Sequence, residues 1–365
     1  MEKTLYAGID LHKTQFTVCV LRGEDGLVVL EEQYPTTDAG YREFSEKMHE
    51  EEEKGYSIEL AVETTGNARY FKNRMEAEGF GVMVVNTNKF KVITMSTKKT
   101  DANDAATLAF YLMKEMLPEA HLCDQTSEEI RRLLKTRSIL VQSVVKIKNQ
   151  IHGMMLGYGI ETKAAQFQSK KKRQELYKDL ADQSYSQFTA SSLEVTLSIL
   201  DTLEEQIKAV EKQLHEMLDE DDTVQLLMTV PGIGFINAST IASYTKDIER
   251  FGGDFKRFSS YLGIVPSVHN SNNTVHLGHI TKHGPQDLRT AFVQVAMGVI
   301  RQPQNTGDWK LMKDYRTMKV EKGSGRAIIA LTRKMARIVF AILNNRTAFD
   351  PSRMYDKPIS IQQTA

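Results

Sequence analysis

Short apolar runs and longer polar stretches alternate along the first 124 residues. Five runs have the continuous or every-second-residue apolar pattern of strands, at residues 5–10, 15–21, 27–33, 57–62 and 82–85. Three stretches have helical spacing, at residues 38–54, 67–79 and 103–116. The first two connections between runs are short enough for hairpins. This order predicts an α/β domain with a mixed sheet and helices on its faces.

The region from residue 125 to residue 222 has apolar positions at steps of three and four, as amphipathic helices do. One such series extends from Ile130 to Ile151, and a second, with a heptad-like pattern, extends from Leu200 to Met217. We therefore expect a helical coiled-coil region of two long helices folded back on each other, joined by smaller helices. The spacing is equally compatible with a hairpin within one chain and with a contact between subunits.

The region from residue 223 to residue 345 is expected to be mainly α-helical and to precede a polar, poorly ordered tail, 346–365. Its turn Pro231-Gly232-Ile233-Gly234 resembles the hairpin of helix-hairpin-helix DNA-binding units. In such units glycine lets backbone N–H groups approach a phosphate. Gly232 and Gly234 are therefore candidates for nucleic-acid binding, and a tight structural turn is an equal alternative.

The charge of the chain is balanced overall and segregated locally. Lys and Arg total 47, as do Asp and Glu, which argues against a simple basic DNA-coating protein. However, residues 131–173 contain eleven Lys and Arg and a single acid, so one segment could contact phosphates. The candidates in this segment form one cluster, Lys170, Lys171, Lys172 and Arg173. The alternative for such a cluster is a solvated loop.

The cysteine content and the absence of long apolar runs restrict the class of protein. Cys19 and Cys123 provide neither a disulfide framework nor a cysteine metal site. No signal sequence and no apolar run of membrane-spanning length is evident. We expect a cytoplasmic protein with no membrane partner.

Four carboxylates stand at the ends of predicted elements. Asp10 ends the first strand, Glu63 ends the fourth, and Asp101 and Asp104 open the helix that follows the fifth. If the first and fourth strands are neighbours, the four converge and repel each other unless a cation lies among them. Such oxygen ligands suit Mg²⁺ or Mn²⁺, and two ions roughly 3.5–4 Å apart support phosphodiester chemistry. The alternative for Asp101 and Asp104 is helix capping, which is compatible with metal binding.

These carboxylates lie in sequence motifs. Gly8-Ile9-Asp10-Leu11-His12-Lys13, Glu63 and Thr100-Asp101-Ala102-Asn103-Asp104-Ala105 together resemble the DEDD signature of the IS110 transposase family. The resemblance implies an RNase H-like domain of the RuvC type over residues 1–124, with the four acids as its catalytic metal ligands. Sugar-kinase and actin-like folds also begin with a strand ending in Asp, but the turn after Asp10 is not Gly-rich as it usually is in those folds.

The C-terminal region extends the resemblance over nearly the whole chain. It has the family's order of motifs: the turn 231–234, a Phe258…Gly263…Pro266 step, and Gly278…Lys282…Gly284…Arg289. The family's nucleophilic serine falls on Ser271, whose usual successor is Gly and here is Asn272, a residue that tolerates positive φ. Ser267 is the reserve candidate. Lys282 and Arg289 are candidate phosphate contacts, with surface charge as the alternative.

The resemblance implies a transposase of an insertion sequence that cuts and rejoins DNA. The metal-bound acids would activate Ser271, which would form a covalent link to a DNA phosphate. The site would combine parts of different protomers in a homo-oligomer, a dimer or a tetramer. An element-encoded bridge RNA would pair with donor and target DNA, as in other RNA-guided systems. Such a protein would be associated with the bacterial nucleoid.

Two other functions remain open at this point. The four acids could serve a structure-specific DNA nuclease of the Holliday-junction resolvase type that uses water as the nucleophile. Alternatively, the chain could be a non-enzymatic nucleic-acid-binding assembly factor whose acids only cap helices.

Overall fold

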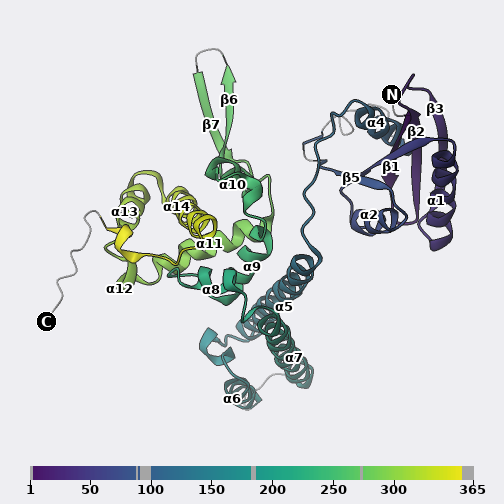
Figure 1. Cartoon of the computed structure of the whole chain (residues 1–365). Coiled ribbons are helices and arrows are strands. Elements are labelled where there is room, and N and C mark those ends of the chain that lie inside the picture. Colours follow the sequence, from purple (N-terminus) through teal and green to yellow (C-terminus); the bar gives the residue numbers. More distant parts are fainter. Residues whose placement is uncertain (1–2, 88, 91–99, 182–185, 272–273, 356–365) are drawn as a thin grey trace. The chain divides into compact units, whose positions relative to one another are not determined.

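The computed structural model describes residues 3–87, 89–90, 100–181, 186–271 and 274–355. The chain forms two compact units, Met1–Cys123 and Asp124–Ala365 (Figure 1). None of the helices in these described ranges combines the length and apolar character needed to cross a membrane.

The first unit is built on one mixed sheet. Its strands are β1 (Lys3–Leu11), β2 (Gln15–Arg22), β3 (Val28–Pro35), β4 (Tyr56–Glu63) and β5 (Gly81–Val85). They lie in the order β3-β2-β1-β4-β5, antiparallel from β3 to β1 and parallel from β1 to β5. The predicted strands and the mixed sheet are therefore confirmed, and the first and fourth strands are neighbours.

Helices cover both faces of this sheet. The helices α1 (Asp38–Glu53) and α2 (Ala68–Ala77) pack on one face, over the side chains of alternate β1 residues such as Leu5 and Ile9. The helix α4 (Asp101–Met113) packs on the opposite face, where Leu108 and Leu112 share a buried apolar cluster with Ala61 of β4. Since side chains alternate along a strand, Gly8 and Asp10 lie on the α4 face of β1.

Gly8 sets the distance between α4 and the sheet. A Cβ atom on Gly8 would lie 2.1 Å from the backbone O of Ala105 and 2.4 Å from the backbone N of Ala109. Only glycine permits this approach, because backbone atoms of a helix cannot move aside as a flexible side chain can. The helix therefore lies directly on β1.

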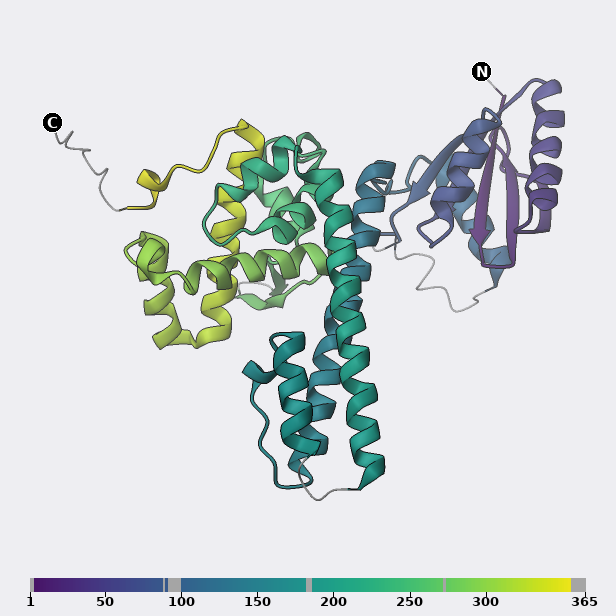
Figure 2. The ribbon, with the colours of Figure 1, turned by 90° about the horizontal axis from the view of Figure 1, so that it is seen from below.

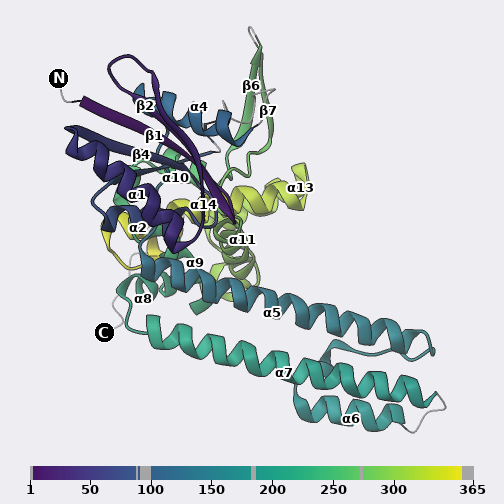
Figure 3. The ribbon, with the colours of Figure 1, turned by 90° about the vertical axis from the view of Figure 1, so that its right-hand side faces the viewer.

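The second unit begins with two long helices, α5 (Gln125–Leu156) and α7 (Gln187–Leu218), which lie side by side (Figures 2 and 3). Arg137 pairs with Glu211 at 2.7 Å, and Lys148, further along α5, pairs with the earlier Glu204 of α7 at 3.5 Å. The helices are thus antiparallel, and the predicted fold-back is confirmed. The smaller elements between them are η1 (Ala164–Phe167) and α6 (Lys170–Ala181).

The rest of the second unit is mainly helical and shares one large core that contains the buried Trp309. Its helices are α8 (Asp222–Met228), α9 (Phe235–Thr245), η2 (Glu249–Phe251), α10 (Phe255–Tyr261), α11 (Gln286–Ile300), α12 (Pro303–Thr306), α13 (Lys310–Lys322), α14 (Ser324–Asn345) and η3 (Pro351–Met354). The prediction of a poorly ordered tail is wrong for residues 346–355, because Phe349, Met354 and Tyr355 pack against this core. The remainder of that tail lies outside the described residues.

A two-stranded antiparallel hairpin interrupts the helices (Figure 1). Its strands are β6 (Pro266–Ser271) and β7 (Thr274–Ile280). The sequence predicted a loop around Ser271, and this prediction is wrong for most of the stretch. A strand pair satisfies its backbone hydrogen bonds without a buried apolar face, so polar composition did not reveal it.

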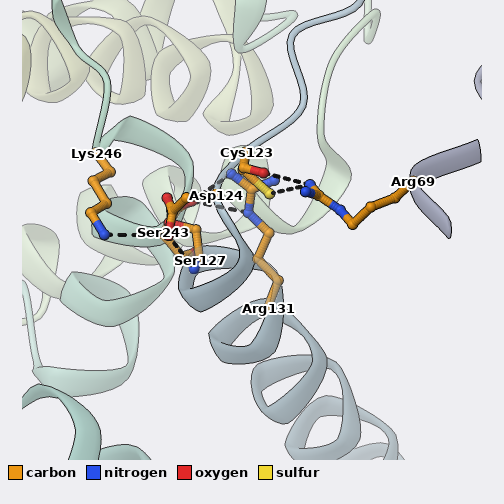
Figure 4. A network of polar contacts seen from close by, with 7 residues as sticks. All are labelled: Arg69, Cys123, Asp124, Ser127, Arg131, Ser243 and Lys246. Atoms are coloured by element: carbon orange, nitrogen blue, oxygen red, sulfur yellow. Dashed lines mark hydrogen bonds and ion pairs between the residues drawn. The ribbon is translucent and has the colours of Figure 1, made fainter. Parts of the chain in front are cut away.

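Each unit has polar contacts of its own next to the boundary between residues 123 and 124 (Figure 4). In the first unit, Arg69 donates to the carbonyl O of Cys123. In the second, Asp124 caps α5 by accepting from the backbone N of Ser127 at 3.0 Å, and it also accepts from Nζ of Lys246 at 3.3 Å. Burial opposes ionisation of Asp124, but the hydrogen bonds from Ser127 and the charge of Lys246 outweigh it and lower its pKa to about 2.

Candidate metal centre

The sheet places Asp10 and Glu63 at one edge. The parallel register pairs Ile9 of β1 with Val62 of β4, so the next residues along each strand stand beside each other. Asp10 is only 7% exposed. Its side chain lies on the α4 face, because the adjacent residue Ile9 points to the opposite face, into the core under α1 and α2.

The first turn of α4 brings two more acids to this edge. Thr100 is the N-cap, and its Oγ1 accepts from the backbone N of Asn103 at 3.3 Å. Asp101 is the first helical residue and Asp104 lies in the same turn. The alternative in which an aspartate is the N-cap of this helix is therefore wrong, because the Thr100 hydroxyl has that role. Both acids do lie in the first turn, and the Asp101 carboxylate makes a different contact.

That contact is with His12. Nε2 of His12 lies 3.2 Å from Oδ2 of Asp10 and 3.4 Å from Oδ1 of Asp101. Asn67 donates to the carbonyl O of His12 at 3.0 Å, which holds the turn after β1 in place. Sequence reasoning gave His12 no role, although its position two residues after Asp10 was the available signal.

The carboxylates destabilise one another's ionised forms. Burial raises the pKa of Asp10, the charges of Asp101 and Asp104 raise it further, and His12 opposes these effects. Burial likewise raises the pKa of Glu63, and the charges of Asp10 and Asp104 add to this. A divalent cation would relieve this repulsion because it favours the ionised form of every nearby carboxylate.

The donor set fits a divalent metal ion. The ligand atoms of Asp10, His12 and Asp101 all lie within 4.8 Å of one another. Two carboxylates and an imidazole are ligands that Mn²⁺ and similar ions accept. The charge of Asp104 raises the pKa of both Asp10 and Glu63, but Glu63 and Asp104 are not part of this group of three. Of the four predicted acids, the structure thus gathers Asp10 and Asp101 around His12 and places the other two nearby.

The basic cluster at the start of α6 divides into two kinds of residue. Lys170, Lys171 and Lys172 are exposed. The side chain of Arg173 is only 4% exposed; its Nε donates to Asp201 at 2.7 Å, and its guanidinium also pairs with Glu204. The prediction that Arg173 contacts nucleic acid is therefore wrong for this structure, because its charge is used to join α6 to α7.

The glycines of the turn between α8 and α9 also differ from each other. Gly232 has φ of +90°, and a Cβ atom there would lie 2.8 Å from the backbone N of Val299 in α11. Packing against α11 therefore explains why residue 232 is a glycine, in agreement with the alternative of a tight structural turn. Gly234 is exposed at the N-cap of α9, with open space around its Cα.

Arg289 has a role that neither sequence-based alternative described. Its Nη1 lies 3.4 Å from the carbonyl O of Leu262 and 3.3 Å from that of Lys282. It therefore links the end of α10 to the turn after β7. Lys282 itself is exposed and has φ of +56°. The turn after β7 also packs closely on the end of α10. A Cβ atom on Gly284 would lie 1.9 Å from the carbonyl O of Tyr261, so this packing accounts for the glycine.

The two candidate serines lie on β6. Ser271 is its last residue and pairs with Thr274 of β7. Asn272, which follows Ser271 where the family has glycine, lies outside the described residues. Ser267 faces Gly278 across the hairpin, and a Cβ atom on Gly278 would lie 2.3 Å from Oγ of Ser267. The packing at Gly278 gives Ser267 a structural role.

Comparison with known proteins gives a consistent result for both units. Residues 7–160 match the sequence model of the DEDD transposases of the IS110 type, described as "Transposase". Residues 224–310 match the model described as "Transposase IS116/IS110/IS902 family".

Curated relatives span most of the chain. A probable family 20 transposase of Pseudomonas aeruginosa is 25% identical over 80% of this chain and 86% of its own length. The transposase for insertion sequence element IS1111A of Coxiella burnetii is 25% identical over 80% of this chain and 79% of its own. The transposase for insertion sequence element IS1328 of Yersinia enterocolitica is 26% identical over 80% of this chain and 85% of its own.

Proposed function

The chain belongs to the IS110 family of insertion-sequence transposases, and we propose that it cuts and rejoins DNA strands through a covalent link to Ser271. The observation that carries this proposal is the cluster of Asp10, His12 and Asp101 at the sheet edge, in a chain with both family segments. We assign residues 1–124 to an RNase H-like domain of the RuvC type, 125–222 to a coiled-coil region and 223–345 to the domain of the nucleophile.

The proposed metal centre consists of residues from the end of β1, the turn after it, β4 and α4. Asp10, Asp101 and His12 would bind a divalent cation, Mg²⁺ or Mn²⁺, with Glu63 and Asp104 completing or neutralising the site. A cation bound there supplies Lewis-acid stabilisation of a phosphodiester undergoing displacement. The rigid sheet edge and the first turn of α4 hold the carboxylates in place, which reduces the cost of bringing like charges together at the moment of reaction.

Ser271 is the proposed nucleophile. Its hydroxyl oxygen forms a bond to a DNA phosphorus as one strand P–O bond breaks, and the hydroxyl proton ends on the departing strand. The resulting phosphoserine ester keeps the phosphodiester energy, so another strand end can displace the serine without net hydrolysis. Ser271 and the carboxylates that serve it would come from different protomers of a homo-oligomer, either a dimer or a tetramer.

Nucleic-acid binding is assigned to exposed groups. Lys170, Lys171, Lys172 and Lys282 are available for phosphates, and Gly234 leaves the N-terminus of α9 open to one. A bridge RNA encoded by the element would pair with donor and target DNA, so most sequence choice would lie in base pairing.

The test of this function is capture of the covalent intermediate. Wild-type protein, incubated with element-end DNA, Mg²⁺ and the bridge RNA, should yield a protein–DNA adduct that survives denaturation, and Ser271→Ala should yield none. Ser267→Ala is the matched control on the same strand and should keep the adduct.

The same assay separates the other two functions. If the protein is a nuclease of the resolvase type, its Ser271→Ala variant would still cut DNA, because water is the nucleophile. If the protein is an assembly factor, the double variant Asp101→Asn with Asp104→Asn would bind DNA as the wild type does. Neither the wild type nor any variant would then cleave DNA. Recombination by wild-type protein without RNA would contradict the RNA-guided part of the proposal.

A further inference from the structure

The second unit contains a cleft of about 940 Å³ at the base of the β6–β7 hairpin. Pro266 and Ile280, at the start of β6 and the end of β7, form part of its wall. The helices α13 and α14, the short helix η3 and Ile264, which follows α10, form the remainder.

The charge of the cleft is strongly positive. Its cationic lining residues are Lys310, Arg326, Arg333, Lys334, Arg337 and Arg353. The acid that lines it, Asp314, pairs with Lys334, and Arg353 pairs with Asp350 at 3.2 Å. In a chain of zero formal net charge, this concentration of cations indicates an anionic ligand.

Three arginines line the cleft from one face of α14. Arg326, Arg333 and Arg337 are separated by steps of seven and four residues, which return to the same side of a helix. Their Cα atoms are thus spaced about 10 Å and about 6 Å along the axis. The guanidinium of Arg337 lies 4.9 Å from the ring centroid of Phe255, which orients it. An extended row of cations suits a polyanion better than a single phosphate.

The other lining residues indicate which part of a nucleic acid would lie in the cleft. They are mostly aliphatic, including Ile264, Ile329 and Ile338, and none of the described residues lining it is aromatic. Aromatic side chains provide the stacking platforms in sites that grip the bases of single strands. This cleft is therefore suited to a sugar–phosphate backbone, which positions a nucleic acid without reading its sequence.

We propose that this cleft binds the backbone of one DNA strand, about five nucleotides from the phosphate that Ser271 attacks. Five residue steps along β6 separate Pro266 in the cleft wall from Ser271, a distance of about 17 Å. A DNA strand advances about 3.4 Å per nucleotide, which gives the five nucleotides. The spacing rests on the proposed function of Ser271; the binding of DNA in the cleft does not.

The first test measures equilibrium binding by full-length protein. Arg326→Gln with Arg333→Gln should weaken binding of a single-stranded 30-mer DNA roughly tenfold at 0.15 M salt. Because each lost phosphate contact lowers the salt slope by about 0.7 for a single strand, the slope should fall by about 1.4. The control, Lys319→Gln with Lys322→Gln, removes the same charge from exposed positions of α13 outside the cleft and should bind as wild type does.

Three results of this experiment would overturn the inference. One is wild-type affinity in the arginine variant, and another is an equal loss in the lysine control. The third is a loss that is larger for single-stranded RNA of the same sequence than for DNA, which would assign the cleft to RNA. Thermal melting of both variants checks that they are folded, and Arg326→Lys with Arg333→Lys should retain most of the affinity.

The second test locates the contact along the DNA. Ethylation of backbone phosphates about five nucleotides from the serine attachment point should interfere with binding by wild-type protein and not by the arginine variant. Interference elsewhere would contradict the stated register. The two proposals fail separately: an absent adduct with arginine-dependent DNA binding contradicts only the serine function, whereas a normal adduct with arginine-independent binding contradicts only the cleft.

Discussion

Nε2 of His12 lies 3.2 Å from Oδ2 of Asp10. The two residues stand at the end of β1, and the same imidazole nitrogen lies 3.4 Å from Oδ1 of Asp101 on α4. The histidine therefore joins the strand to the helix in the region where the carboxylates would hold a metal ion.

His12 is expected to act as a metal ligand and to set the preference for the ion. An imidazole nitrogen is a softer donor than a carboxylate oxygen and favours Mn²⁺ over Mg²⁺. We expect His12→Ala to weaken Mn²⁺ binding by roughly tenfold or more and Mg²⁺ binding by much less, as measured by titration calorimetry. His283→Ala, at an exposed site in the second unit, is the control. An unchanged Mn²⁺ preference in His12→Ala would contradict this role.

The metal-free protein is expected to lose stability as the pH rises. Burial and like charges raise the pKa values of Asp10 and Glu63, so the folded state holds these protons more tightly than the unfolded state. The resulting stabilisation is complete below their ordinary pKa values of about 4 and is lost as the pH rises through the raised values.

Urea unfolding in EDTA across this pH range measures the effect. Asp10→Asn should reduce the pH dependence, since it removes one of the coupled carboxylates. Mg²⁺ or Mn²⁺ at pH 7 should raise the melting temperature of wild-type protein and have much less effect on Asp10→Asn. The exposed Glu24→Gln should resemble wild type in both measurements; a flat pH profile for wild type would argue against repulsion at the site.

Gly8→Ala should destabilise the first unit by about 1–3 kcal/mol or more, the usual cost of overpacking a core. The added methyl group would lie 2.1 Å from a backbone oxygen of α4, so the helix would have to move away from β1. Chemical denaturation followed by circular dichroism measures this. Gly81→Ala, on β5 with open space around its Cα, is the control. Equal stability of the two variants would show that α4 does not rest on Gly8.

Arg173→Met should destabilise the second unit by about 3 kcal/mol, at the lower end of the usual cost because Asp201 and Glu204 are partly exposed. The control, Lys171→Met, changes a side chain that is 87% exposed and should have little effect on stability. DNA binding, compared under conditions where both variants are folded, should weaken more for Lys171→Met. The reverse pattern would restore Arg173 as a nucleic-acid contact.

The sequence by itself determined the elements of the sheet domain and the two long helices of the second unit. Alternating and continuous apolar runs located all five strands of the mixed sheet, and helical periodicity located α1, α2, α5 and α7. These features depend on local spacing along the chain, which is why they could be predicted. The likeness of two separate motif series to one transposase family was likewise present in the residues alone.

Only the tertiary structure decided which polar residues share an environment. The adjacency of β1 and β4 brought Glu63 beside Asp10. The packing of α4 on Gly8 brought Asp101 to His12, although the two residues are distant in the chain. Folding also buried Arg173 against α7 and committed Arg289 to backbone carbonyls, roles that a count of charges could not distinguish from phosphate binding. The physical reason is that burial and partnership arise from contacts between elements, which local sequence patterns do not encode.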